Sequence, residues 1–506
     1  MLALNRIMSM QRDTATGSGV AGKSEPGAGL IASSTGKRKR SPCEQDGDSD
    51  SQAGKIMRST PDLPEQRLDI LSRIHFLLPM REAARAACLS HAFLRPWRCH
   101  PNLIFNKDTI GLKKTYGENF HHKIDRILRN HSGISLKSFE VDYAGTCRFD
   151  GTSYFDSWLQ IAVKPGIEEL TLWLGETRRI YNFPCSVLSD GVQNSLRHLK
   201  IRCCALHPTA ELGPFRSLTS LCLCRVNIKS EELECLLSNS LGLEHLDLTH
   251  CMEIICLKIP CTLQQLTRLD IFECSSLKVL ESKAPNLSSF FHRGFRLPST
   301  MPNLETIVIE SGHEVVDAPT LPSKFLYLKH LRIRLISVSD ISRPYDYFSL
   351  VSFLEASPSL ETLILDVTAL RMAHESIFAD SELRDMPEHR HGCLKSVTIC
   401  GFSSAKILVE LTCYILKNAV SLECLTLDTI YGPRCYQQDN KFERCIPMAD
   451  GVLMETPRAR VAIRTYIENK VPPTVKLTVL EPCNQCHATG KWRMLSQPGD
   501  SISLSF

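Results

Sequence analysis

Two groups of residues in the sequence have types and spacing that could perform chemistry. Near the end of the chain, Cys483, Cys486 and His487 form the string CNQCH, which matches the C-x-x-C-H pattern of covalent c-type haem attachment. In the middle, LEHLDLTHC (243–251) and LTRLDIFEC (266–274) are near-copies that both end in cysteine. Because a cysteine thiolate is both a metal ligand and a nucleophile, either group could belong to a metal, redox or catalytic site.

The CNQCH string lacks the partners that haem or zinc chemistry requires. Haem attachment needs an exported chain, and the first residues, MLALNRIMSMQRD, contain no apolar run typical of a signal peptide. A zinc site needs a second pair of ligands at suitable spacing, and Cys435 and Cys445 are distant in sequence. We therefore expect no metal and no cofactor. A structural or tail role for the string is the leading interpretation, and metal or redox binding is the alternative.

Length and composition are those of an ordinary folded protein. The 506 residues could form several domains or one repeat array, and 43% hydrophobic with 23% charged residues are common values. The net charge of +4 is too small to imply nucleic-acid binding, and most of it lies in residues 1–60. No apolar stretch is long enough to span a membrane, so we expect the chain in the nucleus and/or cytoplasm. Most of its 22 cysteines should then be free thiols.

Residues 1–58 predict a disordered tail, because they are rich in Gly, Ser, Ala and charge and poor in large apolar residues. The tail contains a run of four basic residues, Lys37, Arg38, Lys39 and Arg40. Such a run is typical of a nuclear-localisation signal or a nucleic-acid patch, and the acidic EQDGDSDS that follows disfavours the second. A solubilising charge cluster is the alternative.

Residues 59–106 change in character and predict a compact helical segment. Leu68, Leu71 and Ile74 have helical spacing, and the string MREAARAACLSHAFLRPW contains strong helix formers up to Pro96, which ends or kinks the helix. A segment this short makes only a marginal core. We therefore expect it to pack on the rest of the chain or to bind a partner helix.

This segment resembles an F-box. The resemblance rests on Leu63-Pro64 opening the first helix, on DILSRI, on Leu78-Pro79 and on CLSHAFLRPW as the third helix. F-boxes dock onto the Skp1-like adaptor of a cullin ubiquitin ligase. The resemblance implies an apolar contact with the adaptor through Leu63, Pro64, Ile70, Leu71, Ile74, Leu78, Pro79, Phe93 and Trp97. A generic helical hairpin is the alternative.

From about residue 134 the pattern L-x-x-L-x-L recurs with a spacing of about 26 residues, the period of leucine-rich repeats. No single unit can bury its own apolar face, so neighbouring units must stack. The sequence predicts an α/β repeat solenoid with a curved parallel sheet. The units begin at Leu136, Ile167, Leu196, Leu218, Leu243, Leu266, Leu287, Leu304, Leu328, Leu360, Leu394 and Leu422.

The repeat register also explains the cysteines of the two near-copies. Cys204, Cys251 and Cys274 occupy the position at which a leucine-rich repeat has Asn or Cys turning toward its interior. We therefore expect them to be packing residues. Repeats of this type resemble those of plant F-box/LRR proteins. The helix, turn and strand that end in EPC (481–483) also resemble the ending of that family.

The predicted organisation has five parts. They are a disordered tail (1–58), an F-box (59–106), a linker or N-terminal cap (107–133), a leucine-rich repeat solenoid with a C-terminal cap (134–480) and a C-terminal tail (481–506).

The concave face of a solenoid is its usual binding surface. The strand positions expected to face solvent there mix acidic and basic residues, which argues against a groove for nucleic-acid phosphates. Trp173 and Phe272 are the best apolar anchors. The full set of candidates for target binding is Trp173, Arg202, Asp247, Asp270, Phe272, Arg332 and Arg334.

No nucleophile, phosphate-binding or zinc-protease motif is present in the sequence. With the resemblance above, this favours a non-catalytic substrate-recognition subunit of an SCF-type E3 ubiquitin ligase. The F-box would hold the Skp1-like adaptor, and through it a cullin, while the solenoid binds an unknown target protein. The alternatives are a leucine-rich repeat scaffold outside any ligase and a metal- or haem-binding protein built on CNQCH. We expect neither nucleic acid nor membrane as a partner.

Overall fold

The structure, a computed structural model, divides into two compact units, Met1–His100 and Pro101–Phe506. The residues that it describes are 65–111, 119–132, 136–143, 152–175, 180–209, 212–293, 303–311, 325–336, 346–368, 374–384, 388–430 and 450–483. The predicted tail at 1–58 and its basic run Lys37–Arg40 therefore lie outside the described residues.

The first unit is a small helical assembly formed by α2 (Glu65–Leu77), α3 (Met80–Leu89), a 3-10 turn η2 (His91–Phe93) and α4 (Leu94–Arg98). The prediction that one helix continues to Pro96 was wrong. Ser90 is extended, with φ of −149°, and its hydroxyl accepts a hydrogen bond from the Ala92 amide, so it ends α3 and caps the next turn. Pro96 lies near the start of α4, where a missing amide proton costs little.

Small side chains and two histidines form the centre of this unit. Ala83 and Ala87 are buried on one face of α3. The Nε2 atom of His75 lies 3.0 Å from the Ala83 carbonyl oxygen, and its ring stacks on Phe93 at 5.7 Å. These contacts join α2 to α3 and to the η2 turn. The hydrogen bond also compensates the burial of the polar His75 ring.

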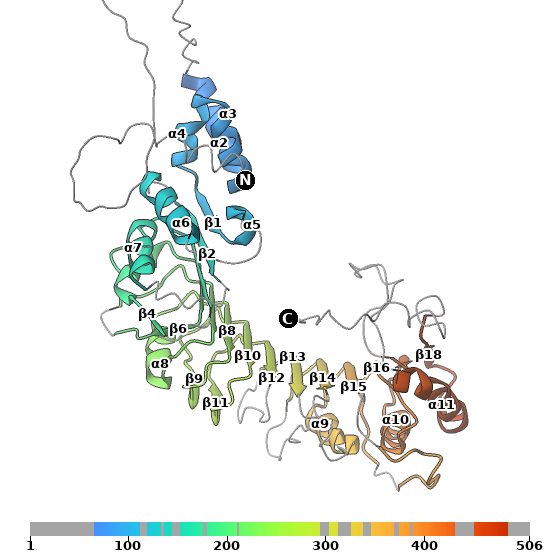
Figure 1. The fold of residues 1–506 in the computed structure, drawn as a ribbon. Helices are drawn as coiled ribbons and strands as arrows, with labels where there is room; N and C mark the ends of the chain where they lie inside the picture. The colour runs from blue at the N-terminus through green and yellow to red at the C-terminus, as the bar shows by residue number, and fades with distance from the viewer. Residues whose placement is uncertain are drawn as a thin grey trace, which may run out of the picture. The chain divides into compact units, whose positions relative to one another are not determined.

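The second unit is built on a parallel sheet that contains fourteen strands within the described residues (Figure 1). Each strand pairs with the one before it, as stacked repeats require. In order, the strands are β1 (Asn102–Phe105), β2 (Ser138–Tyr143), β3 (Glu169–Leu174), β5 (His198–Arg202), β7 (Ser220–Cys224), β8 (His245–Thr249), β10 (Arg268–Phe272), β12 (Ser289–Arg293), β13 (Thr306–Ser311), β14 (His330–Ile336), β15 (Thr362–Thr368), β16 (Ser396–Cys400), β17 (Cys424–Asp428) and β18 (Lys476–Leu480).

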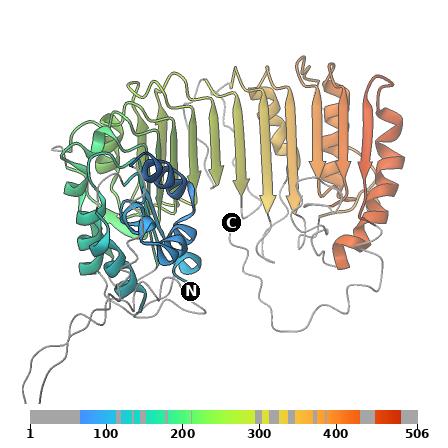
Figure 2. The same cartoon turned by 90° about the horizontal axis from the view of Figure 1, so that it is seen from above.

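The segments between these strands return on one side of the sheet, where α8, α9 and α10 lie (Figure 1; Figure 2). The returns of the central repeats are short strands that pair with each other, β4 with β6 and β9 with β11. The return elements are α5 (Lys107–Ile110), α6 (Asn119–Asn130), α7 (Thr152–Ala162), β4 (Tyr181–Phe183), η3 (Cys185–Leu188), η4 (Val192–Asn194), β6 (Cys204–Leu206), α8 (Ser230–Ser238), β9 (Cys256–Ile259), β11 (Val279–Ser282), η5 (Tyr347–Leu350), α9 (Val351–Ala356), α10 (Lys406–Asn418), α11 (Asp450–Tyr466) and η6 (Glu468–Lys470).

The predicted repeat solenoid is thus confirmed, and so is the closing strand after the last helix, β18, which pairs with β17. The N-cap of α10 is Ala405, whose side chain cannot accept a hydrogen bond, and the Ser404 amide donates instead to the Glu455 carboxylate of α11. A contact between segments far apart in sequence has replaced the local cap.

Some of the predicted domain limits can be compared with the observed helices and strands. Strand β1 lies before residue 106, where the predicted F-box ends, and α5 and α6 fall within the predicted linker or cap. The compact units divide between His100 and Pro101. None of the described helices combines the length and the apolar character needed to cross a membrane.

The cysteines that end the near-copied repeats are packing residues, as predicted. Cys204, Cys251 and Cys274 are all buried and free. The Cys251 thiol donates to the Leu223 carbonyl at 3.4 Å, and the Cys274 thiol donates to the Leu248 carbonyl at 3.5 Å. Each thiol therefore ties its own coil to the strand of the preceding coil.

Candidate protein-binding surfaces

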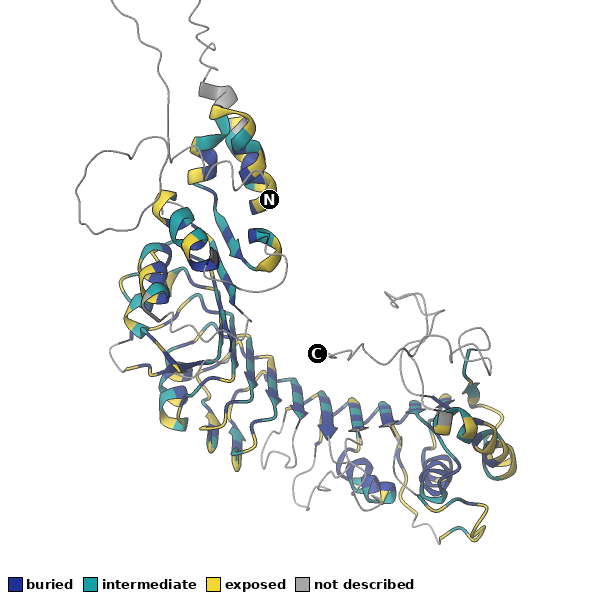
Figure 3. Cartoon of the chain, in the orientation of Figure 1, coloured by how far each residue is buried: buried dark blue, intermediate teal, exposed yellow. Residues whose placement is uncertain are grey.

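Along the strands, buried residues alternate with less buried ones (Figure 3), because successive side chains point to opposite faces of the sheet. We call the face that points away from the core the open face. Strand register places its residues in two rows. The middle row is Glu140, Thr171, Lys200, Cys222, Asp247, Asp270, Phe291, Val308, Arg332, Ile364, Thr398, Thr426 and Thr478. The edge row, nearer the carboxyl ends of the strands, is Asp142, Trp173, Arg202, Cys224, Thr249, Phe272, Arg293, Glu310, Arg334, Asp366, Cys400, Asp428 and Leu480.

All seven candidates for target binding lie in these two rows. Trp173, Arg202, Phe272 and Arg334 belong to the edge row, and Asp247, Asp270 and Arg332 belong to the middle row. The structure therefore brings them to one face, and their role in binding a target stays a prediction.

At the N-terminal side of this face, Arg202 and Trp173 form a cation–π pair. The Arg202 Cζ atom is 5.2 Å from the centre of the Trp173 ring, and the two residues are direct partners across β3 and β5. The Nε atom of Arg202 and the Nε1 atom of Trp173 are both buried without a hydrogen-bond partner among the described residues. Two unsatisfied donors thus lie next to each other on the open face.

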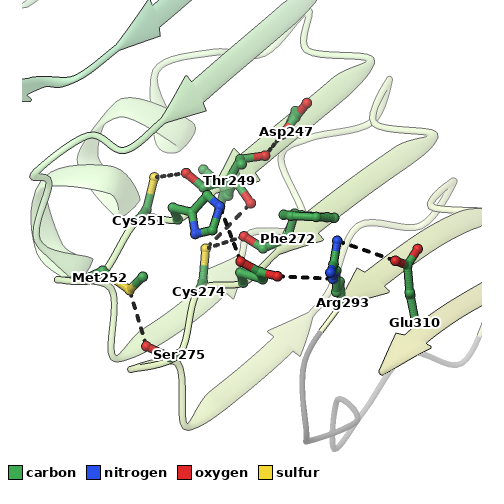
Figure 4. A network of polar contacts seen from close by, with 12 residues as sticks. Asp247, Thr249, Cys251, Met252, Phe272, Cys274, Ser275, Arg293 and Glu310 are labelled. Carbon is green, nitrogen blue, oxygen red and sulfur yellow. Dashed lines mark hydrogen bonds and ion pairs between the residues drawn. The ribbon is translucent and has the colours of Figure 1, made fainter. Parts of the chain in front are cut away.

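Phe272 is the centre of a second cluster (Figure 4). Arg293 lies over it with Cζ 4.4 Å from the ring centre, His250 meets it edge-on at 5.8 Å, and Phe291 stacks parallel to it at 6.5 Å. Arg293 also forms ion pairs with Glu273 at 3.1 Å and Glu310 at 3.4 Å. Aromatic and arginine side chains are enriched at protein interfaces.

Phe291 and Arg293 were missed by the sequence interpretation. The unit that begins at Leu287 departs from the leucine pattern, because Phe290 and His292 fill its inward positions. Their outward neighbours could have been found by extending the alternation of β10 into this unit, since Asp270 pairs with Phe291 and Phe272 with Arg293.

Further along the sheet, the charged candidates Arg332 and Arg334 are both engaged with Asp366. Arg332 Nε is 2.7 Å and Arg334 Nε is 3.3 Å from the Asp366 carboxylate, whose side chain is only 2% exposed. Arg334 also reaches Glu310 at 3.5 Å. Removing either arginine would leave the charge of this buried carboxylate less compensated and should destabilise the sheet.

Asp270 is held in the same way. Burial alone would raise its pKa, but hydrogen bonds from His245 at 3.0 Å and from Arg268 lower the pKa of this carboxyl overall. Asp270 is therefore ionised and already paired. Asp247 accepts a hydrogen bond from the Thr249 hydroxyl at 2.9 Å.

The first unit carries a different surface. Ile70, Ile74 and Leu77 of α2 are 59%, 51% and 85% exposed, and their spacing of four and three residues puts them on one side of the helix. Of the other residues predicted to contact an adaptor, Pro79 is exposed, Leu78 and Phe93 are half-buried, and Trp97 is in the core at 8%. Leu63, Pro64 and the side chain of Leu71 lie outside the described residues. Leu77 was missed, although it continues the same helical spacing.

The CNQCH string falls mostly outside the described residues. Cys483 is half-buried, whereas Cys486 and His487 are not described. Within the described part of the chain, no group of three or more His, Cys, Asp or Glu side chains could hold a metal ion.

Comparison with known proteins gives one family and several relatives. A family model described as "At1g61320/AtMIF1, LRR domain" matches residues 127–296 and 290–484. The F-box/LRR-repeat protein At3g03360 of Arabidopsis thaliana is 25% identical over 63% of this chain and 61% of its own length, so the match spans less than two thirds of that relative. The F-box/FBD/LRR-repeat protein At1g13570 of the same plant is 23% identical over 76% of this chain and 94% of its own length.

Two further similarities are more limited. The FBD-associated F-box protein At5g56380 of Arabidopsis thaliana is 31% identical over 21% of this chain and 24% of its own length. Among solved structures, the LRR protein LIC12759 of Leptospira interrogans is 13% identical, with a TM-score of 0.27, over 74% of this chain and 94% of that chain.

Proposed function

The chain belongs to the plant F-box/LRR proteins, and from this premise we propose that it is a substrate-recognition subunit of an SCF-type E3 ubiquitin ligase. In this proposal the first unit binds a Skp1-like adaptor, and through it a cullin. The leucine-rich repeat unit binds a target protein on its open face.

The observation that carries the proposal is the apolar stripe of Ile70, Ile74 and Leu77 on α2. Large aliphatic side chains left in water are costly, and burying each against a partner is worth about 1.5–3 kcal/mol. The stripe lies in the segment that resembles an F-box. A helix presenting residues at this spacing fits an apolar groove on a helical partner.

The proposed mechanism requires no reacting group in this chain. Holding the target on the same complex as the ubiquitin-carrying enzyme raises the effective concentration of a target lysine near the reactive thioester. The contribution of the chain is binding and orientation alone.

A pull-down with a purified Skp1-like adaptor tests the proposal. The wild-type chain should retain the adaptor, and the double variant Ile70→Glu/Ile74→Glu should lose it, because two charges would be carried into an apolar contact. Val461→Glu, which changes an equally exposed aliphatic residue of α11, serves as the matched control and should bind like wild type. Failure of the wild-type chain to bind would reject the proposal.

The alternative is a leucine-rich repeat scaffold that acts outside a ligase. All fourteen described strands of the main sheet belong to the second unit, so the open face needs no strand from the first unit. This observation favours the alternative. It predicts that a chain lacking residues 59–100, which end before β1, retains its cellular function.

A further inference from the structure

The helices of the first unit carry an excess of positive charge. From Ile70 to His100 the chain has five arginines and a single acidic residue, Glu82. All five arginine side chains are exposed, and they come from three helices: Arg73 from α2, Arg81 and Arg85 from α3, and Arg95 and Arg98 from α4. Five positive charges against one negative leave this part of the unit cationic at its surface.

Only one of these arginines is engaged within the protein. Arg85 forms an ion pair with Glu82 at 3.1 Å, and both side chains remain about half exposed. The other four make no hydrogen bond, ion pair or ring contact with the described part of the chain. The remaining acidic residues of this segment, Asp62, Glu65 and Asp69, all come before Ile70 in the sequence. Four guanidinium groups are therefore left to water or to a partner.

Arg73 lies inside the apolar stripe of α2. It comes three positions after Ile70 and four before Leu77, and residues at these spacings are neighbours on one side of a helix. A partner that covers the stripe must therefore also cover or border the Arg73 guanidinium. If that partner offered no acidic group, the guanidinium would lose water and gain no counter-charge, which is costly. The position of Arg73 thus specifies a chemical property of whatever covers Ile70, Ile74 and Leu77.

Helix α3 shows the same combination of cationic and aliphatic groups. Arg81, Arg85 and Leu89 are spaced by four residues each, so they follow one side of the helix. The Leu89 side chain is 88% exposed, the largest exposed fraction among the large apolar residues of this unit. A surface that mixes apolar and acidic groups would therefore suit α3 as well as α2.

We propose that the adaptor surface facing the first unit is acidic: an apolar groove receives the stripe of α2, and a carboxylate at the edge of that groove pairs with Arg73. The inference rests on the proposed function, because the partner is the Skp1-like adaptor. A carboxylate is the matching group, since it accepts two parallel hydrogen bonds from a guanidinium. The other unpaired arginines, Arg81, Arg95 and Arg98, give the unit a positive field that accelerates the approach of an acidic partner.

An anionic membrane and a nucleic acid fit this surface less well. A helix that lies on a membrane keeps its cations on the polar face, opposite a wide apolar face that often contains Trp or Phe. On α2 the cation Arg73 lies within a narrow stripe of aliphatic residues, and the aromatic residue of the helix, Phe76, is half-buried. A phosphate backbone would pair with the arginines but would leave the aliphatic stripe in water.

The test measures binding of the full-length chain to a purified Skp1-like adaptor at low and at high salt. Affinity for wild type should fall as salt rises, because screening weakens contacts between exposed charges. Arg73→Gln should lower the affinity about tenfold at low salt, and Arg73→Lys, which keeps the charge, should lose less. Arg81→Gln/Arg95→Gln/Arg98→Gln should slow association at low salt and leave the dissociation rate nearly unchanged.

The matched control is Arg464→Gln, which removes an exposed arginine of α11 that has no partner among the described residues. It should bind the adaptor like wild type. Because the Arg73 side chain makes no contact within the described chain, Arg73→Gln should unfold at the wild-type temperature, which separates lost binding from lost folding.

The possible outcomes distinguish this inference from the proposed function. Adaptor binding that changes neither with salt nor with Arg73→Gln would overturn the acidic surface and leave the ligase role intact. Absence of adaptor binding by wild type at both salt concentrations would reject both ideas. Tighter binding to phosphatidylserine vesicles or to double-stranded DNA than to the adaptor, lost in Arg73→Gln, would assign the arginine to another class of partner and overturn the inference.

Discussion

The Nε2 atom of His391 lies 3.2 Å from the hydroxyl of Tyr414, and both rings are buried beneath the later repeats. The contact joins the turn before β16 to the middle of α10. Burial, with a smaller contribution from neighbouring His389 at a ring distance of 5.0 Å, lowers the pKa of His391 to about 4. His391 is therefore neutral in the folded protein at physiological pH.

This pair predicts a loss of stability on mild acidification. Between its ordinary pKa of about 6.5 and its folded value of about 4, the unfolded chain binds a proton on His391 that the folded chain does not. Stability must therefore fall as pH falls through that window, by up to roughly 3 kcal/mol from this residue. Urea unfolding at several pH values should show a smaller pH dependence for H391Q than for wild type. If the free energy of unfolding of H391Q depended on pH as strongly as that of wild type, His391 would not be the residue responsible.

The buried cysteines predict a stability effect that exposed cysteines lack. Cys251→Ala removes a buried sulfur and its hydrogen bond to the Leu223 carbonyl, which should lower the free energy of unfolding by about 1–2 kcal/mol. Cys261→Ala changes an exposed thiol and is the matched control. Denaturant titrations of both variants check this. Equal stabilities would mean that Cys251 makes no packing contribution.

Two phenylalanine positions on adjacent strands should separate core packing from the open face. Phe290 is buried in the core, so Phe290→Ala should cost about 3–5 kcal/mol of unfolding free energy. Phe272 lies on the open face, so Phe272→Ala should cost much less. Thermal unfolding of both variants measures the difference. The opposite ranking of stabilities would contradict the strand register.

The basic run in the N-terminal segment predicts nuclear import. Replacing Lys37, Arg38, Lys39 and Arg40 with Ala should shift a fluorescently tagged chain from the nucleus to the cytoplasm. Replacing Lys417 and Lys470, which lie in the folded second unit, should not do so. An unchanged distribution of the first variant would leave the run with only a solubilising role.

The repeat pattern was sufficient to predict the architecture and the two rows of the open face, because alternation along a strand and stacking of repeats fix which side chains point where. For the same reason, the repeat pattern was sufficient to predict that Cys251 and Cys274 are buried packing residues. It could not predict that Arg332 and Arg334 both turn to Asp366, a partner more than thirty positions away in sequence. Nor could it foresee that Glu455 would replace a local cap at α10. The repeat period predicts the strand register. Pairing between side chains of different coils depends on side-chain conformations, and these are determined only in the assembled sheet.

The turns that follow β5, β7, β8 and β10 have a left-handed backbone conformation, and this bears on which side chains can be displayed there. In these turns the backbone path is held by hydrogen bonds to the next strand, although the residues are Cys203, Arg225, His250 and Glu273 and none is glycine. Their side chains are thus free of the task of shaping the chain. The side chain displayed at such a turn can therefore differ from one repeat to the next while the backbone keeps the same path.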